Sequence, residues 1–561
     1  MNRRRFVGSV AAAGTGMLLH RSAVWSAQPY RARLLLRGAT LYDGTGSAPI
    51  TGDVALDGDR IIGLGRNLSV SGTEIIDLRG LALAPGFIDI HSHTDLSLFV
   101  NPRAESKIRQ GVTTEIAGQD GSSVGPVSTE AAARTSENYK QRYGVELGFT
   151  DLQGFFLRLE RHRSSVNLGS MVGAGTIRGL VIGNDNRPPT DTELTRMVAL
   201  VEQALRQGAL GLSSGLEYSP GGFATRDELV ALARALRATA LPYASHMRNE
   251  DDELFAAVEE AIAVGRFAGV PVQISHLKAQ GQRNWWKSNP VLKTIEDARA
   301  GGIDVLFDRY PYVAYATGLS NLFPLWTLDG GTRGFLQRIQ DPAQRPRIEA
   351  YVRDKIDELG SWDAVQITST GDALTWARGK RMGQLARERN TEPYELLLEI
   401  TIADENRTGM VGFGMSEEST ADMLKHPLGM ICSDAGARAT YGPLSEGSPH
   451  PRTYGSFPRV LGHYCRDQKL MPLETAVHKM SFMPARRLKL EGRGVIQPNA
   501  FADLVAFDPV RVADRATFER PHQYPVGIPH VWVNGEAVIR NGEHTGSLPG
   551  RVLRGAAATL G

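Results

Sequence analysis

The stretch "GFIDIHSHTD" (residues 86–95) leads from an apolar, strand-like run into two histidines that are separated by one residue. Residues i and i+2 of a strand face the same side, so His91 and His93 are expected to point into one space. In a parallel α/β fold, the carboxyl ends of the strands are where active sites are built. Two imidazoles at such an end suit a divalent metal ion, although a pair of surface histidines would show the same spacing.

The middle of the chain, residues 86–487, alternates short apolar runs with amphipathic stretches. Runs such as "VTTEIAG" (112–118) and "IDVLFD" (303–308) are separated by helical patterns such as "TDTELTRMVALVEQALRQG" (190–208). Strands that alternate with helices indicate βα units and a parallel sheet. We therefore predict an α/β fold, a TIM-like (β/α)8 barrel, with an insertion near residues 319–365, a segment rich in charge and helix formers.

Short strand patterns also occur at both ends of the chain. Residues 28–85 contain "ARLLLRGATLYDG", and residues 488–555 contain "HVWVNGEAVIRNGE", in which Asn534-Gly535 is a strong hairpin signal. We expect the two segments to form one small β-sandwich domain that is built from both ends of the chain.

The first 27 residues predict an export signal. The chain begins "MNRRRFVGSV", and a mostly apolar run follows to Leu19. The pattern Arg3-Arg4-x-Phe6-Val7 is typical of twin-arginine signals, which predicts a periplasmic or exported protein that crosses the membrane in folded form. The apolar run is shorter than the roughly 17 to 25 residues of a transmembrane span, but an uncleaved signal anchor remains an alternative.

The composition is that of an ordinary globular protein. Of 561 residues, 42% are hydrophobic and 22% are charged, and the net charge is +2. Nothing in this balance favours nucleic acid or an anionic membrane, so the expected partner is a small-molecule substrate and no stable membrane partner is expected. Cys432 and Cys465 are too few for a disulfide framework.

Four further polar residues lie at the ends of strand-like runs. His246 closes "LPYASHM", His276 closes "PVQISHL", Asp434 follows "GMICS", and Asp120 follows the strand after the two histidines. A helix cap or a buried hydrogen bond would explain any one of them. Their regular placement on strand ends predicts a shared site, where imidazoles and carboxylates are suited to bind a divalent metal.

Taken together, the motifs resemble those of the amidohydrolase superfamily, and within it the N-acyl-D-amino-acid deacylases (D-aminoacylases). The matching stretches occur in the order of that family and cover nearly all of the chain after the signal. They are "APGFIDIHSHTD", "GVTTEIAGQDG", "GALGLSSGLEYSPG", "SHMRNEDD", "VQISHLKAQG", "DRYPYVA", "SDAG", "HPRTYGSFPRVLG" and "GVIQPNAFADLVAFDP".

The resemblance implies a metal centre with zinc, as one or two divalent ions. His91 and His93 would bind one metal position, and His246 and His276 the other. Asp120 stands in "GQDG", where the deacylases usually have "GNCG", so a carboxylate would replace a cysteine ligand. A carboxylate is a harder ligand than a thiolate, which favours a weaker preference for zinc or a two-metal site. A second departure is Ala174, where many relatives have histidine.

The resemblance also implies roles in catalysis and in substrate binding. Asp434 would be the catalytic carboxylate, which accepts a proton from water and passes it to the leaving nitrogen. Lys278, Tyr310 and Arg452 would hold the carboxylate of the substrate, and Tyr218 would border it. The implied activity is metal-dependent hydrolysis of N-acyl-D-amino acids or related N-acyl compounds, which releases a carboxylate and a free amine.

Two alternatives lie within the same superfamily: a cyclic-amide hydrolase of the hydantoinase or dihydroorotase type, and a D-dipeptide hydrolase. Hydantoinases and many dihydroorotases use a carbamylated lysine as a metal bridge. Between His93 and His246 the only lysines are Lys107 and Lys140, both in polar surroundings and neither at a strand end. This favours the deacylase. A binding protein that kept the barrel without catalysis is a third possibility.

Overall fold

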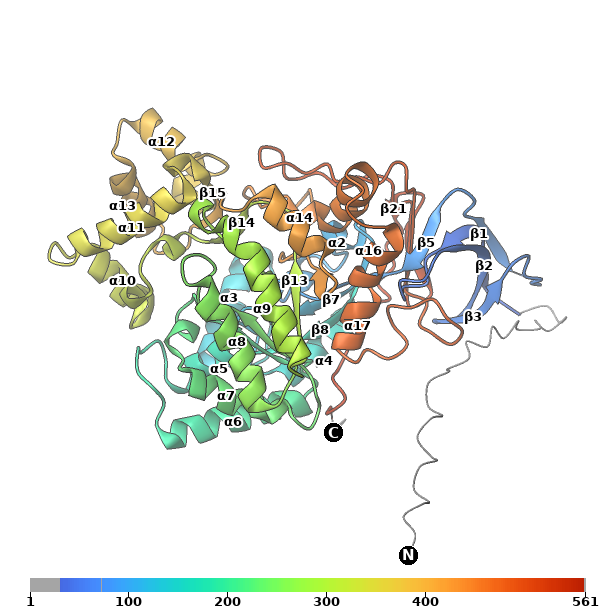
Figure 1. Cartoon of the computed structure of the whole chain (residues 1–561), viewed down its shortest axis with the longest axis horizontal. Helices are drawn as coiled ribbons and strands as arrows, with labels where there is room; N and C mark the ends of the chain where they lie inside the picture. Colours follow the sequence, from blue (N-terminus) through green and yellow to red (C-terminus); the bar gives the residue numbers. More distant parts are fainter. Residues whose placement is uncertain (1–30, 72, 559–561) are drawn as a thin grey trace, which may run out of the picture.

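The computed structural model describes residues 31–71 and 73–558. The predicted export signal, residues 1–27, lies outside the described residues. Within the described part, no helix has both the length and the apolar character that crossing a membrane requires. Along its long axis the molecule has a strand-rich region at one end, a central region of helices around strands, and a helical lobe at the other end (Figure 1).

The strand-rich region is one nine-stranded sheet that draws on both ends of the chain. Its strands are β1 (Leu34–Leu41), β2 (Ile50–Asp57), β3 (Arg60–Gly65), β4 (Glu74–Asp77), β5 (Ala82–Pro85), β18 (Leu504–Phe507), β19 (His530–Val533), β20 (Glu536–Arg540) and β21 (Glu543–His544). β5 pairs antiparallel with β18, which joins the N-terminal strands to the C-terminal ones. Leu36, Val54 and Trp532 belong to a buried core of this region. The sheet therefore depends on both ends of the chain at once.

Short parallel strands, almost entirely buried, form the centre. They are β6 (Phe87–Asp89), β7 (Val112–Ala117), β8 (Asn167–Ser170), β9 (Val172–Gly173), β10 (Leu212–Gly215), β11 (Tyr243–His246), β12 (Val272–Ile274), β13 (Val305–Arg309) and β17 (Gly429–Ile431). One sheet has the order β6-β7-β8, and the other β9-β10-β11-β12-β13-β17. Only Met171 separates β8 from β9, and a parallel bridge joins Ser92, beyond β6, to Ala435, beyond β17. The carboxyl ends of these strands therefore lie on the same side.

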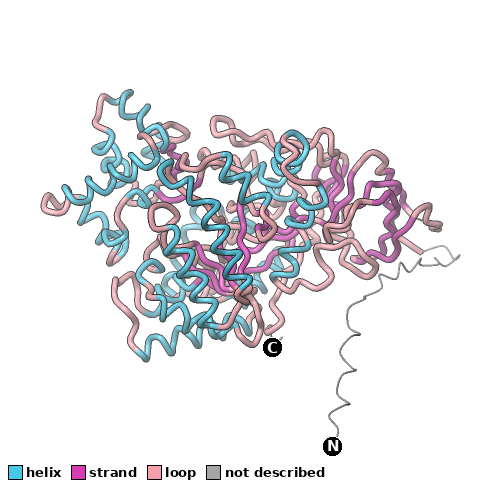
Figure 2. Tube along the Cα trace, in the orientation of Figure 1, coloured by secondary structure: helices cyan, strands magenta, loops and turns pink. Residues whose placement is uncertain are grey.

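Helices surround these strands (Figure 2). α6 (Asp191–Arg206) begins at a capping box: the Thr190 hydroxyl accepts from Glu193 N at 3.3 Å, and the Glu193 carboxylate accepts from Thr190 N at 2.8 Å. Met197 and Val201, four residues apart, face the core. The other helices of this region are α1 (Ser97–Val100), α2 (Glu105–Ile108), α3 (Thr129–Tyr143), α4 (Leu152–His162), α5 (Ala174–Val181), α7 (Arg226–Ala233), α8 (Leu254–Ala268), α9 (Ser288–Ala300), α14 (Glu417–Lys425), α15 (Arg452–Arg459), α16 (Leu473–Met480) and α17 (Phe482–Arg487).

The helical lobe lies between β13 and β17 in the sequence. It contains α10 (Gly331–Ile339), α11 (Arg345–Leu359), α12 (Met382–Arg389), α13 (Pro393–Ala403) and the strands β14 (Tyr315–Gly318), β15 (Val365–Ser369) and β16 (Gly409–Gly412). The three strands form an antiparallel sheet of order β14-β16-β15. This region extends on both sides of residues 319–365, because the sheet takes one strand from before the helices and its middle strand from after them.

The chain after β21 runs back to the central strands. Leu168 N donates to Arg551 O at 2.9 Å, and Leu553 N donates to Leu168 O at 2.8 Å. Gly555 N donates to Gly208 O at 3.0 Å. The last described residues are thus attached to β8 and to the turn before β10.

Candidate active site

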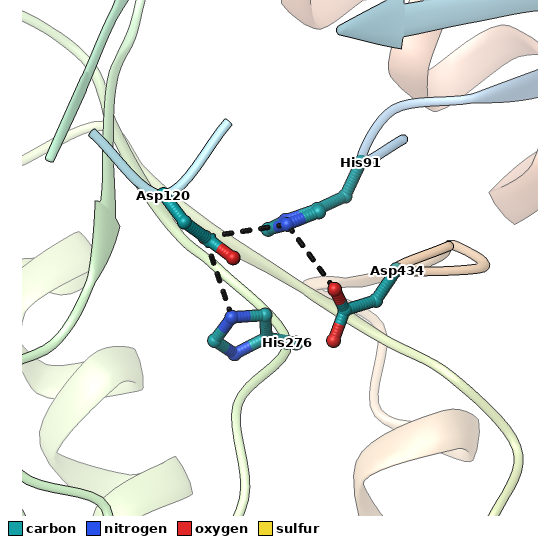
Figure 3. A group of neighbouring side chains, drawn as sticks. All are labelled: His91, Asp120, His276 and Asp434. Atoms are coloured by element: carbon teal, nitrogen blue, oxygen red, sulfur yellow. Dashed lines mark ion pairs between the residues drawn. The ribbon is translucent and has the colours of Figure 1, made fainter. Parts of the chain in front are cut away.

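Two histidines and two aspartates converge beyond the carboxyl ends of the central strands. His91, Asp120, His276 and Asp434 each offer a side-chain atom, and these atoms all lie within 4.8 Å of one another. Each residue follows a different strand: β6, β7, β12 and β17. Figure 3 shows the four side chains pointing toward one another from separate parts of the chain. The structure thus brings together residues from four separate segments, the first at His91 and the last at Asp434.

Asp120 is at the centre of four imidazoles. Its Oδ1 lies 3.3 Å from His91 Nε2 and 3.4 Å from His276 Nε2. Its Oδ2 lies 3.3 Å from His93 Nε2 and 3.8 Å from His246 Nδ1. All five predicted metal ligands therefore meet at one carboxylate.

A tight loop after β7 places Asp120. The residue has a positive φ of 52°, and Gly121 follows with a φ of 72°. A Cβ on Gly121 would lie 2.5 Å from Gly215 N, at the end of β10, so only glycine allows this approach. Asp120 and its loop are therefore held against β10 with the carboxylate turned into the site.

A second group of possible ligands overlaps the first. It consists of His246, Glu250 and His276. His246 Nδ1 lies 2.9 Å from His276 Nε2, and His276 Nδ1 lies 3.1 Å from Glu250 Oε1. His276 belongs to both groups. The arrangement thus offers two adjacent positions for a cation.

The carboxylates of this cluster are balanced by positive charge. Burial opposes ionisation of Asp120, yet the imidazoles of His91 and His276 hold the pKa of its carboxyl well below its usual range. Burial likewise disfavours a charged His93, but hydrogen bonds to Asp120 and Asp434 raise its pKa to about 9. Protons on the imidazoles thus supply the positive charge that the carboxylates demand, and a divalent ion would supply it equally.

Several candidate ligand atoms lack hydrogen-bond partners, which also fits a metal site. Both ring nitrogens of His91 and Oδ1 of Asp120 are buried, and among the described residues they have no hydrogen-bond partner. Buried polar atoms are rarely left unpaired, because the loss of water costs free energy. Imidazole nitrogen and carboxylate oxygen are both zinc ligands. The residues present therefore fit a divalent metal ion.

Asp434 is held ionised at the edge of the cluster. Its Oδ1 lies 3.0 Å from His93 Nε2, and its Oδ2 accepts from Arg452 Nη1 at 2.7 Å. Burial opposes its charge, but Arg452 and the imidazole of His276 hold the pKa of Asp434 well below its usual range. An ionised carboxylate that faces the cluster is able to accept a proton from a molecule bound there.

Three of the four predicted substrate-binding residues, Tyr218, Lys278 and Arg452, line a cavity of about 440 Å³. His93, His246 and His276 line it as well. Lys278 is already engaged, because its Nζ donates to both oxygens of Glu250 at 2.6 and 2.7 Å. Tyr310 is fully buried, with its ring 4.6 Å from Arg452 Cζ. It packs against Arg452 and is not among the residues that line the cavity.

Tyr218 contacts both the cluster and the helical lobe. Its ring centroid lies 4.6 Å from that of His246, and its hydroxyl accepts from Thr317 Oγ1 at 3.2 Å. Thr317 belongs to β14, so this hydrogen bond connects the helical lobe to the wall of the cavity.

Three carboxylates around the histidines were not assigned to the site from the sequence. Asp308 Oδ1 accepts from His276 N at 2.8 Å and lies 3.5 Å from His91 Nδ1. Glu217 Oε2 lies 3.3 Å from His246 Nε2, and Glu250 contacts His276 as described. Carboxylates at the far nitrogen of a ligating histidine fix the orientation of its ring. Asp308 could have been predicted from the sequence, because it lies at the end of the strand-like run "IDVLFD", as His276 lies at the end of its own run.

Lys107 lies on α2 among polar groups, as the sequence indicated, and these groups are buried. It is fully buried, and its Nζ donates to Asp89 Oδ2 at 2.7 Å, to Ser433 Oγ at 2.7 Å and to Ala435 O at 2.6 Å. Glu115 Oε1 lies 3.1 Å away. The ammonium group therefore connects β6, β7 and the segment after β17, where it binds the residues on both sides of Asp434.

Comparisons with known proteins place the chain. It matches the model of the amidohydrolase family over residues 74–288 and 442–539. D-aminoacylase of Alcaligenes xylosoxydans xylosoxydans is 36% identical over 531 residues, which cover 94% of this chain and 98% of that protein. A similar solved structure is that of N-acyl-D-glutamate deacylase from Bordetella bronchiseptica, which contains zinc and a phosphonate that mimics the tetrahedral intermediate. Its sequence is 31% identical, its TM-score is 0.78, and the match covers 94% of this chain and 100% of that chain.

The cyclic-amide hydrolases are more distant. Dihydropyrimidinase from Brevibacillus agri NCHU1002 is 15% identical with a TM-score of 0.54, over 94% of this chain and 99% of that chain, which is a likeness in fold alone. The α/β fold is thus common to both kinds of enzyme, whereas substantial sequence identity is found with the deacylases. This confirms the family that the motifs indicated: the chain belongs to the amidohydrolase family, in the group of the D-aminoacylases and N-acyl-D-amino-acid deacylases.

Proposed function

We propose that the protein hydrolyses the amide bond of N-acyl-D-amino acids in a metal-dependent reaction. The observation that carries this proposal is the convergence of four imidazoles on Asp120, with the ionised Asp434 beside them. Two related proteins are named D-aminoacylase and N-acyl-D-glutamate deacylase, which are names for enzymes that act on this class of substrate. The structure of the second contains zinc. A cavity lined by both carboxylates and cations suits a small, charged substrate.

We also propose that the central strands close into a (β/α)8 barrel within residues 86–487. The bridge between Ser92 and Ala435 supports this, since it joins the two outer edges of the parallel sheets. A closed barrel would explain why residues after β6, β12 and β17 meet at one point. The nine-stranded sheet would be the β-sandwich domain, folded on itself around the core that contains Trp532.

Zinc is the metal that we propose, as one or two ions. The ligands would be His91 and His93 at one position and His246 and His276 at the other, with Asp120 between them. A bound zinc ion would lower the pKa of a water to about 7 and would polarise the amide carbonyl.

The remaining steps fall to residues of the chain. Asp434 would take a proton from the attacking water and give it to the leaving nitrogen, without which the amine is a poor leaving group. Arg452 would keep Asp434 ionised and would offer its other donors to the carboxylate of the substrate. Glu250 would hold Lys278 and the ring of His276 in place through the contacts described above.

A cyclic amide and a D-dipeptide are the alternative substrates. A panel of N-acetyl-D-amino acids, N-acetyl-L-amino acids, hydantoin, dihydroorotate and D-dipeptides would separate them. We expect kcat/KM to be highest for an N-acetyl-D-amino acid. Faster turnover of hydantoin or dihydroorotate would overturn the proposal.

Asp120→Asn is expected to weaken zinc binding by at least about tenfold, because the variant keeps the size of the side chain but removes the charge that all four imidazoles face. The measurement is zinc per chain by mass spectrometry after dialysis against graded concentrations of a chelator. Asp185→Asn, at an exposed position, is the matched control and should keep the zinc content of the wild type. Equal zinc retention by both variants would contradict the assignment of Asp120 as a ligand.

Export by the twin-arginine route is proposed from residues 1–27 of the sequence alone. Replacement of Arg3 and Arg4 together by lysine is expected to retain the protein in the cytoplasm, since the pair is the recognised part of such signals. Cell fractionation followed by immunoblotting measures this. The proposal fails if the double variant is recovered from the periplasm as fully as the wild type.

A further inference from the structure

A second cavity lies beside the candidate active site, and its volume is about 370 Å³. His93 and Ser122 line both this cavity and the one of about 440 Å³, so the two spaces meet at the metal-ligand candidates. Its walls are the segment after β6, the loop after β7, one side of α3, and the segment after α3. We call this space the acyl cavity, after the group that we assign to it below.

The wall of the acyl cavity is apolar where it lies away from His93. The apolar side chains that line it are Leu96, Val124, Val127, Ala131, Ala132, Leu147 and Phe149. Three hydroxyl groups of the wall donate to backbone oxygens: Ser97 to Thr94 O at 2.6 Å, Ser123 to Gly125 O at 2.7 Å and Thr135 to Ala131 O at 3.0 Å. The carboxylate in the wall is that of Asp95, near His93, and it accepts from Gly118 N at 3.2 Å. None of the described residues that line it is a lysine or an arginine. The cavity therefore suits an uncharged, apolar group.

α3 leaves this space open. The helix is capped at both ends, by Ser128 and Gly144, but none of its residues is fully buried. Ala131 and Ala132 are only half-buried, while the next residue, Ala133, is exposed. A helix that turns small apolar side chains toward a cavity leaves room for a group that comes from elsewhere.

The strand order gives the direction in which a substrate would lie. Lys278 follows β12, whereas the acyl cavity is lined by residues that follow β6 and β7. In the two parallel sheets, the strands β8, β9, β10 and β11 lie between β7 and β12. The strand that precedes Lys278 is therefore well separated from β7. The carboxylate and the side chain of an N-acyl amino acid are attached to one carbon, on the nitrogen side of the scissile bond. A substrate whose carboxylate is held on the side of Lys278 would therefore have room for its acyl chain in the acyl cavity.

We propose that the acyl cavity binds the acyl chain of the substrate and gives the enzyme a preference for straight, apolar acyl chains longer than acetyl. This inference rests on the proposed function. Each methylene that moves from water into such a cavity is expected to raise kcat/KM about fourfold. Hexanoyl has four more methylenes than acetyl, so the preference for hexanoyl over acetyl should reach up to about 250-fold.

The test compares the N-acetyl and N-hexanoyl derivatives of whichever D-amino acid the zinc-loaded wild type hydrolyses fastest as its N-acetyl derivative. Ala132→Phe places a ring in the acyl cavity and is expected to lower the hexanoyl-to-acetyl ratio of kcat/KM at least tenfold. Ala133→Phe, one position along the same helix, adds the same ring on the exposed side and should leave the ratio unchanged. Val124→Phe fills the cavity from the loop and replaces the first variant if that one does not fold.

Three outcomes would overturn the assignment. The first is an equal kcat/KM of the wild type for acetyl and hexanoyl. The second is a preference for a glycyl over a hexanoyl group, which would make the cavity a site for an aminoacyl group. The third is a change in preference for the amino-acid side chain, and not for the acyl chain, in Ala132→Phe. Failure of the proposed function itself is distinct, because then the zinc-loaded wild type would hydrolyse neither derivative.

Discussion

Asp434→Asn is expected to lower kcat for N-acetyl-D-amino acids by about 10²- to 10⁴-fold, the range that a general acid–base group contributes. Asparagine keeps an oxygen acceptor for Arg452 Nη1, which donates to Asp434 at 2.7 Å in the wild type. It does not accept a proton from water at neutral pH, and it has none to give to the leaving nitrogen. Steady-state kinetics on zinc-loaded protein, together with zinc content by mass spectrometry, measure the effect.

The pattern of kinetic constants separates this role from a merely structural one. Zinc content should stay within experimental error of the wild type, and KM should change less than threefold, because the variant retains the contact to Arg452. A large rise in KM with kcat preserved would mean that Asp434 acts by holding Arg452. Wild-type turnover would remove Asp434 from the mechanism altogether.

Lys107→Met is expected to destabilise the protein by about 3–5 kcal/mol, the cost of removing one partner from a buried ion pair. The ammonium group lies 2.7 Å from Asp89 Oδ2 and 3.1 Å from Glu115 Oε1, and all three side chains are fully buried. Its loss leaves two carboxylates without a counter-charge in the interior. Chemical denaturation monitored by circular dichroism measures the change in the free energy of unfolding.

The matched control is Lys140→Met. Lys140 pairs with Glu146 at 2.6 Å, but the two side chains are 56% and 69% exposed. Exposed pairs contribute about 0–1 kcal/mol, so this variant should unfold close to the wild type. Equal stability of the two variants would show that the buried network around Lys107 does not stabilise the fold. A loss of zinc in Lys107→Met at temperatures where it is folded would show, in addition, that the network positions the ligands.

The sequence predicted those residues of the site that lie at strand ends, where the alternation of side chains along a strand indicates which way they point. His91 and His93 are two residues apart at the end of one strand, and His246 and His276 close two others, so alternation places them on one side. The family resemblance added the roles of Asp120 and Asp434. The structure places the predicted metal ligands within 3.8 Å of Asp120 oxygens.

The parts that were missed depend on tertiary contacts. Glu217 and Glu250 lie in loops after strands, where no period indicates which way a side chain points. Lys107 lies on the four-residue helix α2, too short to show an apolar face, so its burial arises only from the packing of β6, β7 and β17 around it. The sequence also did not show that Lys278 is already paired. Its partner Glu250 follows β11, whereas Lys278 follows β12, and only the fold brings the two together.

The pairing of β5 with β18 means that the sheet is completed only after nearly all of the chain has been synthesised. β5 emerges from the ribosome early, but its partner is among the last segments to be synthesised, so the edge of β5 stays exposed during most of translation. Exposed strand edges recruit other chains. We therefore expect the nascent polypeptide to be prone to aggregation until β18 is made, and a chain that ends before β18 to keep this edge unpaired.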